Sequence, residues 1–269
     1  MEPKVDVLIP TYRRPAALAV TLTSLMAQTF RPFRVVVSDQ SEGEPAAGRG
    51  EVKAVLRVLR ETGRAAEAHT HLPRQGMAEH RDHLLGKAKT PYVLFLDDDV
   101  VLEPWVLQRL METIERQKCG FVGCGLIGLS YAEDVRPDEQ HVELWEGRVQ
   151  PEHVEPGSVE WERYKLHNAA NLLHVQRELG ATPDKPLPYR VAWVGGCTLY
   201  DAAKLRDCGG YEFWRDLPPD HAGEDVLAQL RVMERYGGCG ILPPGAYHQE
   251  LPTTVTMRRV DAPRALGRV

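Results

Sequence analysis

Two kinds of hydrophobic pattern alternate along the first 130 residues of this chain. Short, nearly continuous apolar runs alternate with segments in which apolar residues recur every three or four positions, as they do on one face of a helix. The apolar runs predict strands at 5–9, 34–39, 92–96 and 120–129. The helical segments are at 15–26, 76–88 and 103–117. Strands that alternate with helices of about a dozen residues indicate an α/β fold with a mostly parallel central sheet flanked by helices.

The pattern lapses between residues 131 and 190. Residues 133–162 contain ten Asp or Glu side chains against two Arg, together with several prolines. This composition predicts a solvated, loop-rich insertion, with a short helix somewhere in 162–179.

Regular patterning returns after the insertion. A strand is expected at 190–200, followed by a small helix from Asp201 and the turn "CGGY". Apolar spacing in 224–237 predicts a helix that Gly237 terminates. The last strand is expected at 240–248, and the basic tail beyond it is expected to be a solvated terminus.

The charge, the lengths of the apolar runs and the cysteine content exclude several classes of function. The chain has 269 residues and a formal net charge of −5, which gives no sign of a nucleic-acid partner. No apolar run approaches the roughly 20 residues that span a bilayer, and the N-terminus goes directly into a strand-like segment without a signal-like core. We therefore expect a cytoplasmic protein. Its five cysteines are odd in number and lack a CxxC pair, which favours incidental thiols over disulfides or zinc.

Three adjacent aspartates end the strand at 92–96. In an extended chain Asp97 and Asp99 point to one face and Asp98 to the other. Two carboxylates spaced in this way suit Mg²⁺ or Mn²⁺, which take one or two protein carboxylates and fill their other positions with phosphate and water. Capping of the next helix would account for one aspartate, but not for three.

Several motifs together resemble family 2 glycosyltransferases of the GT-A fold. The first half carries "VLIPTYRRP", "VVVSDQS", "GMAEHRDHLL" and "FLDDDV", and the second carries "WVGGCTLY", "CGGY" and "GEDVLAQLRVMERYG". The resemblance covers roughly residues 4–130 and 190–250. It implies a nucleotide-sugar-binding half at 1–130 and an acceptor-binding half of the same domain at 131–250. The insertion at 131–190 and the tail at 251–269 lie outside the resemblance, and the insertion is expected to form an acceptor wall.

The resemblance also implies a role for individual residues. The donor would be a nucleotide-diphosphate sugar, with UDP preferred to GDP or dTDP, and the cofactor Mn²⁺ or Mg²⁺. The expected nucleotide-binding residues are Pro10, Thr11, Tyr12, Arg13, Asp39, Arg81, Asp97 and Asp98. The metal ligands that the resemblance implies are Asp97 and Asp99, and His248, just past the last expected strand, could be a third. Asp225, with Glu224 beside it, matches the general base, and Trp193, Gly195 and Gly196 match the acceptor side. The resemblance implies transfer to a hydroxyl with inversion. Transfer of a single sugar is expected because the processive Gln-x-x-Arg-Trp signature and membrane spans are missing.

Roles in capping, packing or solvation, without any contact to a ligand, remain open for several of these residues. Asp39 could cap a turn, Tyr12 could only pack its loop, and Arg81 could be a solvated helix residue. Acidic residues at 224 and 225 would also be favoured by the helix dipole. A histidine such as His248 is more often a surface or hydrogen-bonded residue than a ligand.

Two rival functions come from other classes. "VLFLDDDVV" also fits the nucleophile strand of a haloacid-dehalogenase-type phosphatase, with Asp97 as nucleophile and Asp99 as acid. That motif normally lies on a first strand, whereas three strand–helix segments precede it here. A non-catalytic nucleotide-sugar-binding protein is the second rival, since a fold does not fix a function.

Overall fold

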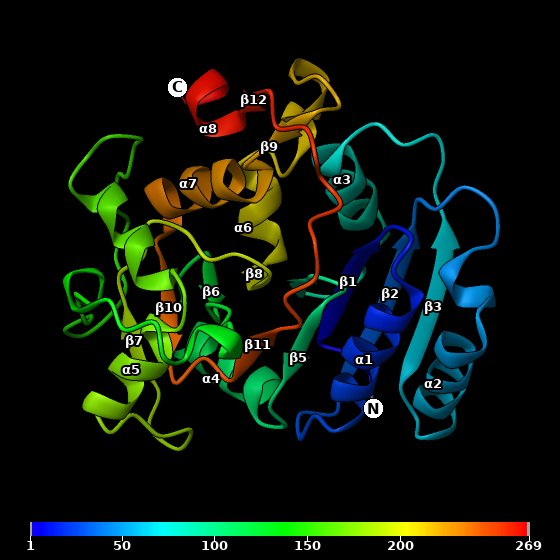
Figure 1. Cartoon of the computed structure of the whole chain (residues 1–269), viewed down its shortest axis with the longest axis horizontal. Helices are drawn as coiled ribbons and strands as arrows, with labels where there is room; N and C mark the ends of the chain where they lie inside the picture. Colours follow the sequence, from blue (N-terminus) through cyan, green and yellow to red (C-terminus); the bar gives the residue numbers. More distant parts are fainter. Residues whose placement is uncertain (1, 268–269) are drawn as a thin grey trace.

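An eight-stranded sheet forms the centre of the molecule. The computed structural model describes residues 2–267, and the strands lie in the order β3-β2-β1-β4-β8-β6-β10-β7 (Figure 1). β3, β2, β1 and β4 are parallel, as are β6 and β10, whereas β8 and β7 run antiparallel to their neighbours. The sheet strands are β1 (Val5–Thr11), β2 (Phe33–Asp39), β3 (Ala65–Thr70), β4 (Tyr92–Leu96), β6 (Phe121–Gly123), β7 (Leu187–Tyr189), β8 (Cys197–Asp201) and β10 (Gly238–Leu242).

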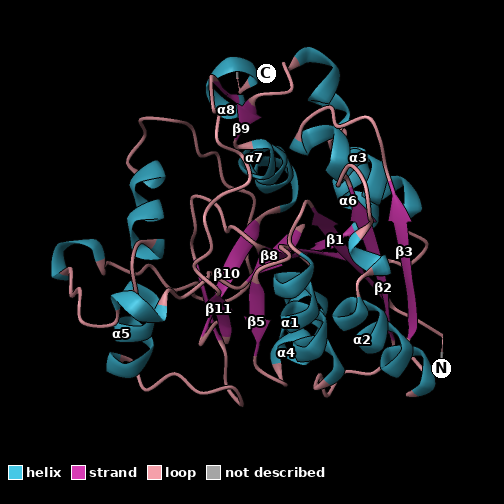
Figure 2. Ribbon diagram, turned by 45° about the vertical axis from the view of Figure 1, so that its right-hand side comes forward, coloured by secondary structure: helices cyan, strands magenta, loops and turns pink. Residues whose placement is uncertain are grey.

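Helices cover both faces of the sheet (Figure 2). One face packs against α1, α2 and α4, and the other against α3, α6 and α7. The helices are α1 (Pro15–Met26), α2 (Gly50–Glu61), α3 (Met77–Lys87), α4 (Val106–Gln117), α5 (Asn171–Glu178), α6 (Ala202–Asp207), α7 (Glu224–Tyr236) and α8 (Ala262–Leu266). This arrangement confirms the predicted α/β class.

Side-chain alternation divides the core into two layers. In β4, Leu94 and Leu96 enter the layer beneath α1, α2 and α4, while Val93 and Phe95 enter the layer beneath α3 and α7. Because successive strand residues point to opposite faces, a strand covered on both sides must be apolar throughout. This requirement explains the continuous apolar runs in the sequence.

The structure differs from the sequence predictions where elements are short. α2, β3 and β5 (Val100–Leu102) were not predicted, and β6 is only three residues long within the strand expected at 120–129. The strand expected at 240–248 is two strands, β10 and β11 (Ala246–His248), separated at Pro243 and Pro244. Proline removes a ladder donor, which explains the break. β11 leaves the main sheet and pairs with β5 beside the aspartate triplet.

The acidic insertion is loop-rich and its acidic side chains are half-buried or exposed, as predicted, but it is anchored to the rest of the fold. Its predicted helix is present as α5, and β7 joins it to the edge of the main sheet. Arg163 forms ion pairs with Glu143 and Glu152 at 2.8 and 2.9 Å, and Arg190 also pairs with Glu152 at 2.9 Å. The excess negative charge is thus partly neutralised by arginines that lie outside the acidic stretch.

Residues 249–261, which we call the C-terminal strap, are mostly exposed, as expected of a solvated terminus, but they are attached to the fold. After β11 the chain crosses the sheet's carboxyl edge, and its short strand β12 (Val260–Asp261) pairs with β9 (His221–Ala222) before α8 packs on α7 (Figure 1). Gln249 donates hydrogen bonds to Ala17 O at 3.2 Å and Thr21 Oγ1 at 3.3 Å. Tertiary contacts thus fix this segment, which has no hydrophobic period of its own.

No helix within residues 2–267 combines the length and apolar character that a membrane crossing requires.

A buried ion pair joins β1 to β2. Arg34 donates to both carboxylate oxygens of Asp6 at 2.7 and 2.9 Å, and Asp6 is fully buried. The same carboxylate accepts the backbone N–H groups of Lys89 and Thr90, which lead into β4. One charge pair thereby fixes the register of three neighbouring strands.

Arg34→Met should destabilise the protein by about 3–5 kcal/mol, because it leaves the Asp6 carboxylate buried without its partner. Urea unfolding followed by circular dichroism measures this loss. Arg49→Met is the matched control, since Arg49 pairs with Glu44 on the surface and should cost less than about 1 kcal/mol. Equal losses in the two variants would contradict the assignment.

Candidate active site

A cleft of about 630 Å³ opens at the carboxyl ends of β1 and β4. The loop after β1 and the aspartate triplet form one side, and the start of α7 forms the other. The C-terminal strap crosses it and contributes Thr253, Thr254 and Val255 to its lining. Ligands of open α/β sheets bind in this place, beyond the strand ends.

Arg14 neutralises one side of the aspartate triplet. Its guanidinium donates to Asp99 Oδ2 at 2.7 Å and to Asp98 Oδ1 at 3.3 Å, and it also contacts the carbonyl of Pro252 in the strap. Asp98 accepts the Thr11 hydroxyl at 2.6 Å, and burial raises the pKa of Asp98 to about 6. Burial alone would raise the pKa of Asp99 as well, but the hydrogen bond from His248 and the charge of Arg14 lower it.

Arg81 connects the triplet to the far side of the cleft. This buried α3 residue donates to Asp97 Oδ1 at 3.1 Å and to Glu224 Oε1 at 3.0 Å. Burial alone would lower the pKa of Arg81, but the two carboxylates raise it, so the guanidinium stays charged. Arg81 therefore lines the cleft, but its guanidinium is bonded to two carboxylates.

Asp225 lies at the start of α7, beside Glu224. Burial is the main cause that raises the pKa of Asp225 to about 7, and the charge of Glu224 is the second. The charge of Asp97 also raises this pKa, whereas the charge of Arg81 lowers it. Its environment also includes the buried Tyr211, with which it lines a small inner cavity. A carboxylate with a pKa near neutrality is suited to take up a proton.

His248 lies close to Asp99. Its Nε2 atom is 3.4 Å from Asp99 Oδ2, whereas Asp97 turns toward Arg81. A carboxylate and an imidazole form a donor set that Mn²⁺ accepts, and a diphosphate would supply further oxygens. Within residues 2–267, no cluster of three His, Cys, Asp or Glu side chains is arranged to hold a metal. The residues present thus fit a metal held jointly with a ligand.

The end of β1 and the loop after it place three of the four residues predicted there on the cleft. Pro10, Thr11 and Tyr12 line it, whereas Arg13 is exposed and pairs with Glu42. The guanidinium of Arg74 lies over the Tyr12 ring, 3.9 Å from its centroid.

Asp39 is not among the cleft-lining residues. Its buried carboxylate accepts the backbone N–H groups of Ser41 and Ala46, which is the turn-capping role left open by the sequence. Its neighbour Gln40 lines the cleft instead.

The acceptor-side residues contribute in different ways. Trp193 lines the cleft with Asp225. Gly196 has a φ of +75°, and its carbonyl accepts the N–H of Asp97 at 2.9 Å. A Cβ on Gly196 would lie 2.4 Å from Leu126 Cδ1, so glycine is required there. A Cβ on Gly195 would meet no atom within 4 Å, and the structure shows no comparable constraint on it.

Sequence reasoning missed several cleft residues. The nucleotide-binding residues expected from the sequence include Arg13 but not its neighbour Arg14, although Arg14 is the residue that contacts the triplet. His221 of β9 joins the start of α3 to the segment before β9, accepting Ala78 N–H at Nε2 and donating from Nδ1 to Pro218 O. The Arg14–Asp99 and His221–Ala78 contacts join residues that are 85 and 143 positions apart, so no local pattern could have indicated them.

The sequence model described as "Glycosyl transferase family 2" matches residues 6–157, which is more than half of the chain. The chain belongs to glycosyl transferase family 2. The match includes the loop after β1 and the aspartate triplet, and it ends within the insertion.

Among curated proteins, this family 2 chain is similar to the GalNAc(5)-diNAcBac-PP-undecaprenol beta-1,3-glucosyltransferase of Campylobacter jejuni. The two are 28% identical over 111 residues, which is 41% of this chain. The match spans only about a third (34%) of the relative's length.

Solved structures share the fold of this family 2 chain. Staphylococcus aureus TarS 1-349 in complex with UDP-GlcNAc has a TM-score of 0.54 at 16% identity, over 93% of this chain and 59% of the other. Mannosyltransferase PcManGT from Pyrobaculum calidifontis, in complex with GDP-Man and Mn²⁺, has a TM-score of 0.51 at 17% identity, over 89% of this chain and 57% of the other. These likenesses confirm the predicted GT-A arrangement.

Asp225→Asn should raise the melting temperature, by an amount that grows between about pH 4 and pH 7. The folded pKa of Asp225 lies above its unfolded value of about 4, so the wild type loses stability as pH rises through this window. The amide removes that loss, and the gain should be constant above pH 7. Differential scanning calorimetry from pH 4 to pH 8 measures it.

Asp138→Asn on the exposed surface is the control and should show no such trend. A pH-independent difference between Asp225→Asn and the wild type would contradict the raised pKa.

Proposed function

We propose that this protein transfers a single sugar from a nucleotide-diphosphate sugar to an acceptor hydroxyl, with a divalent metal and with inversion at the anomeric carbon. The observation that carries the proposal is the arrangement of two acidic centres in one cleft. The aspartate triplet and Asp225 lie on opposite sides, and the buried Arg81 bridges Asp97 of the first to Glu224 beside the second.

The donor is proposed to lie along the loop after β1. Tyr12, whose ring is contacted by Arg13 and Arg74, would lie beside the base, and Asp39 shapes the turn that follows β2. UDP is the preferred nucleotide and GDP or dTDP the alternatives, since fold neighbours were solved with UDP-GlcNAc and with GDP-Man. Asp99 and His248, with Asp97 nearby, would hold Mn²⁺ or Mg²⁺.

The bound metal would stabilise negative charge as it develops on the departing diphosphate. Asp225 takes the proton from the acceptor hydroxyl, which is a poor nucleophile until a carboxylate removes its proton. Glu224 is bonded to Arg81, and burial together with the charge of Glu224 raises the pKa of Asp225 so that its carboxylate can accept that proton. A base on one side of the anomeric carbon and the leaving group on the other give a single displacement with inversion.

The phosphatase alternative is not favoured. The aspartate triplet lies on the fourth strand of the chain, within the segment that matches glycosyl transferase family 2. Asp97, its required nucleophile, is hydrogen-bonded to Arg81, which also pairs with Glu224.

Asp99→Ala should abolish metal-dependent nucleotide binding. With saturating Mn²⁺ and a nucleotide at about one hundred times its dissociation constant, the wild type should melt about 5–10 °C higher, and the variant should not. A thermal-shift screen of UDP, GDP and dTDP with Mn²⁺ or with EDTA measures this. Asp138→Ala is the control and should respond like the wild type. An undiminished, EDTA-sensitive shift in Asp99→Ala would contradict the metal assignment.

Asp225→Asn should bind nucleotide and metal normally but lose transfer by about 10²–10⁴-fold, because it cannot take up the acceptor proton. The wild-type kcat/KM should rise with pH up to about 7 and then level off, since only the ionised carboxylate is a base. Release of nucleoside diphosphate from the donor is the assay. Near wild-type turnover in Asp225→Asn would disprove the base assignment, and binding without turnover in the wild type would favour the non-catalytic alternative.

A further inference from the structure

One guanidinium joins the aspartate triplet to the C-terminal strap. Nη1 of Arg14 donates to Asp99 Oδ2 at 2.7 Å and to Asp98 Oδ1 at 3.3 Å. Its Nη2 atom donates to the carbonyl oxygen of Pro252 in the strap. The Arg14 side chain is 15% exposed and the Asp99 side chain 7%, so their ion pair lies within the wall of the cleft. Because a guanidinium is a rigid planar fork, Arg14 cannot leave Asp99 without disturbing its bond to the strap.

The oxygen of Asp99 that Arg14 contacts is also the one that faces His248. Asp99 Oδ2 is 3.4 Å from His248 Nε2, and these two residues are proposed to hold the divalent metal. A guanidinium bonded to a carboxylate oxygen repels a second cation on that oxygen, and the repulsion is strong where little water screens it. Metal binding at Asp99 Oδ2 therefore opposes the contact of Arg14 with the same atom.

A second arginine holds the strap in a similar way. Arg74 donates to the carbonyl oxygen of Thr254 at 3.4 Å, and its guanidinium lies 3.9 Å from the centroid of the Tyr12 ring. Tyr12 is proposed to lie beside the base of the donor. Both arginines thus bind backbone carbonyls of the strap, and each lies on a group that the donor or its metal is proposed to use.

The two ends of the strap are attached separately from these arginines. At one end, the N–H of Gln249 donates to the carbonyl oxygen of Asp99 at 2.8 Å. At the other end, β12 pairs with β9, and Arg259 forms an ion pair with Asp220 at 3.2 Å. Between these ends, residues 250–258 are mostly exposed and cross the cleft (Figure 1). The middle of the strap is therefore free to leave the cleft while both ends stay attached.

We propose that Arg14 is a positioning residue that keeps the strap over the cleft until a divalent cation replaces it on Asp99. This inference rests on the proposed function, because it takes the aspartate triplet as the metal site. In the metal-free protein, Arg14 neutralises Asp98 and Asp99 and tethers Pro252. Once Asp99 binds a cation, Arg14 loses this contact, the tether breaks and the middle of the strap leaves the cleft. Metal binding and the closed strap therefore weaken each other by the same factor.

Hydrogen exchange of the whole chain, followed by mass spectrometry, tests this coupling. Peptides that cover residues 250–258 should exchange their amide hydrogens several-fold faster with saturating Mn²⁺ than with EDTA, because the tether is lost. In Arg14→Met they should exchange fast under both conditions, since the tether is already absent. Peptides from α2, which does not line the cleft, are the internal reference and should not respond to Mn²⁺.

The Mn²⁺ affinity without nucleotide is the second measurement. Arg14→Met should bind Mn²⁺ about tenfold more tightly than the wild type, because the guanidinium no longer competes for Asp99. Electron paramagnetic resonance of free Mn²⁺ gives the dissociation constant. Loss of a positive charge would by itself tighten Mn²⁺ binding, but it would not make the exchange of the strap insensitive to Mn²⁺.

Two further variants separate the contacts of Arg14 from the loss of an arginine. Arg49→Met is the matched control, since Arg49 pairs with Glu44 on the surface, and it should change neither the Mn²⁺ affinity nor the response of the strap. Arg74→Met should speed the exchange of the strap, because Arg74 bonds to Thr254. It should change the Mn²⁺ affinity by less than about twofold, since the ion pair of Arg14 with Asp99 remains.

Two results would overturn this inference and leave the proposed function intact. One is Mn²⁺ binding by the wild type with unchanged or slower exchange of the strap, a comparison that decides the question even if Arg14→Met does not fold. The other is a folded Arg14→Met variant whose strap still responds to Mn²⁺ or whose Mn²⁺ affinity equals that of the wild type. A wild-type protein that binds neither Mn²⁺ nor any nucleotide in its presence would instead overturn the proposed function, and this inference with it.

Discussion

Pairing of carboxylates with two arginines is the interaction on which the cleft depends. Asp97, Asp98 and Asp99 lie next to one another at the end of a buried strand, where repulsion and burial oppose their ionisation. Arg14 contacts Asp98 and Asp99 from α1's leading loop, and Arg81 contacts Asp97 from α3. Each arginine also reaches a distant segment, Pro252 in the strap and Glu224 on α7 respectively. Neutralising the triplet therefore also assembles the cleft.

The same contacts separate the roles of neighbouring acids. Glu224 and Asp225 are adjacent on α7, but Glu224 is bonded to Arg81, whereas burial and the charge of Glu224 raise the pKa of Asp225 to about 7. In the triplet, Asp98 is held by Thr11, and Asp99 faces His248. One helix and one strand end thus carry acids with different environments, which is a common basis for dividing catalytic tasks.

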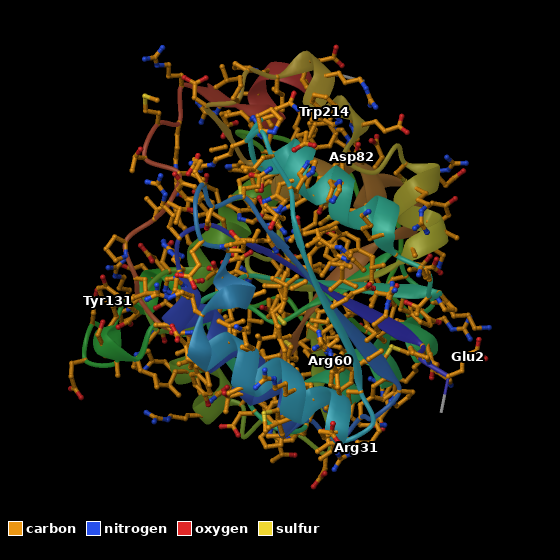
Figure 3. The ribbon with its side chains drawn as sticks, turned by 90° about the vertical axis from the view of Figure 1, so that its right-hand side faces the viewer. Glu2, Arg31, Arg60, Asp82, Tyr131 and Trp214 are labelled. Carbon is orange, nitrogen blue, oxygen red and sulfur yellow. The ribbon has the colours of Figure 1, made fainter. Side chains whose placement is uncertain are left out.

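Long-range packing gives the less regular parts of the chain their places. The insertion contributes Trp161 and Tyr164 beside Trp193, and its Arg163 pairs with acidic residues that sequence reasoning took to be solvated. At the top of the molecule, Asp82 of α3 accepts the indole N–H of Trp214 at 3.0 Å, and the two residues lie side by side in Figure 3. The C-terminal strap completes the cleft through β12 and Gln249.

The sequence by itself determined the α/β class, the acidic positions of the cleft, and the strands and helices of the first half other than α2, β3 and β5. It could do so because a strand buried on both faces must be continuously apolar and a covering helix must repeat every three or four residues. Only the tertiary structure decided that Asp39 caps a turn, that Arg14 rather than Arg13 reaches the triplet, and that the strap crosses the cleft and pairs with β9. Those outcomes depend on contacts between residues far apart in sequence, whose geometry leaves no local pattern.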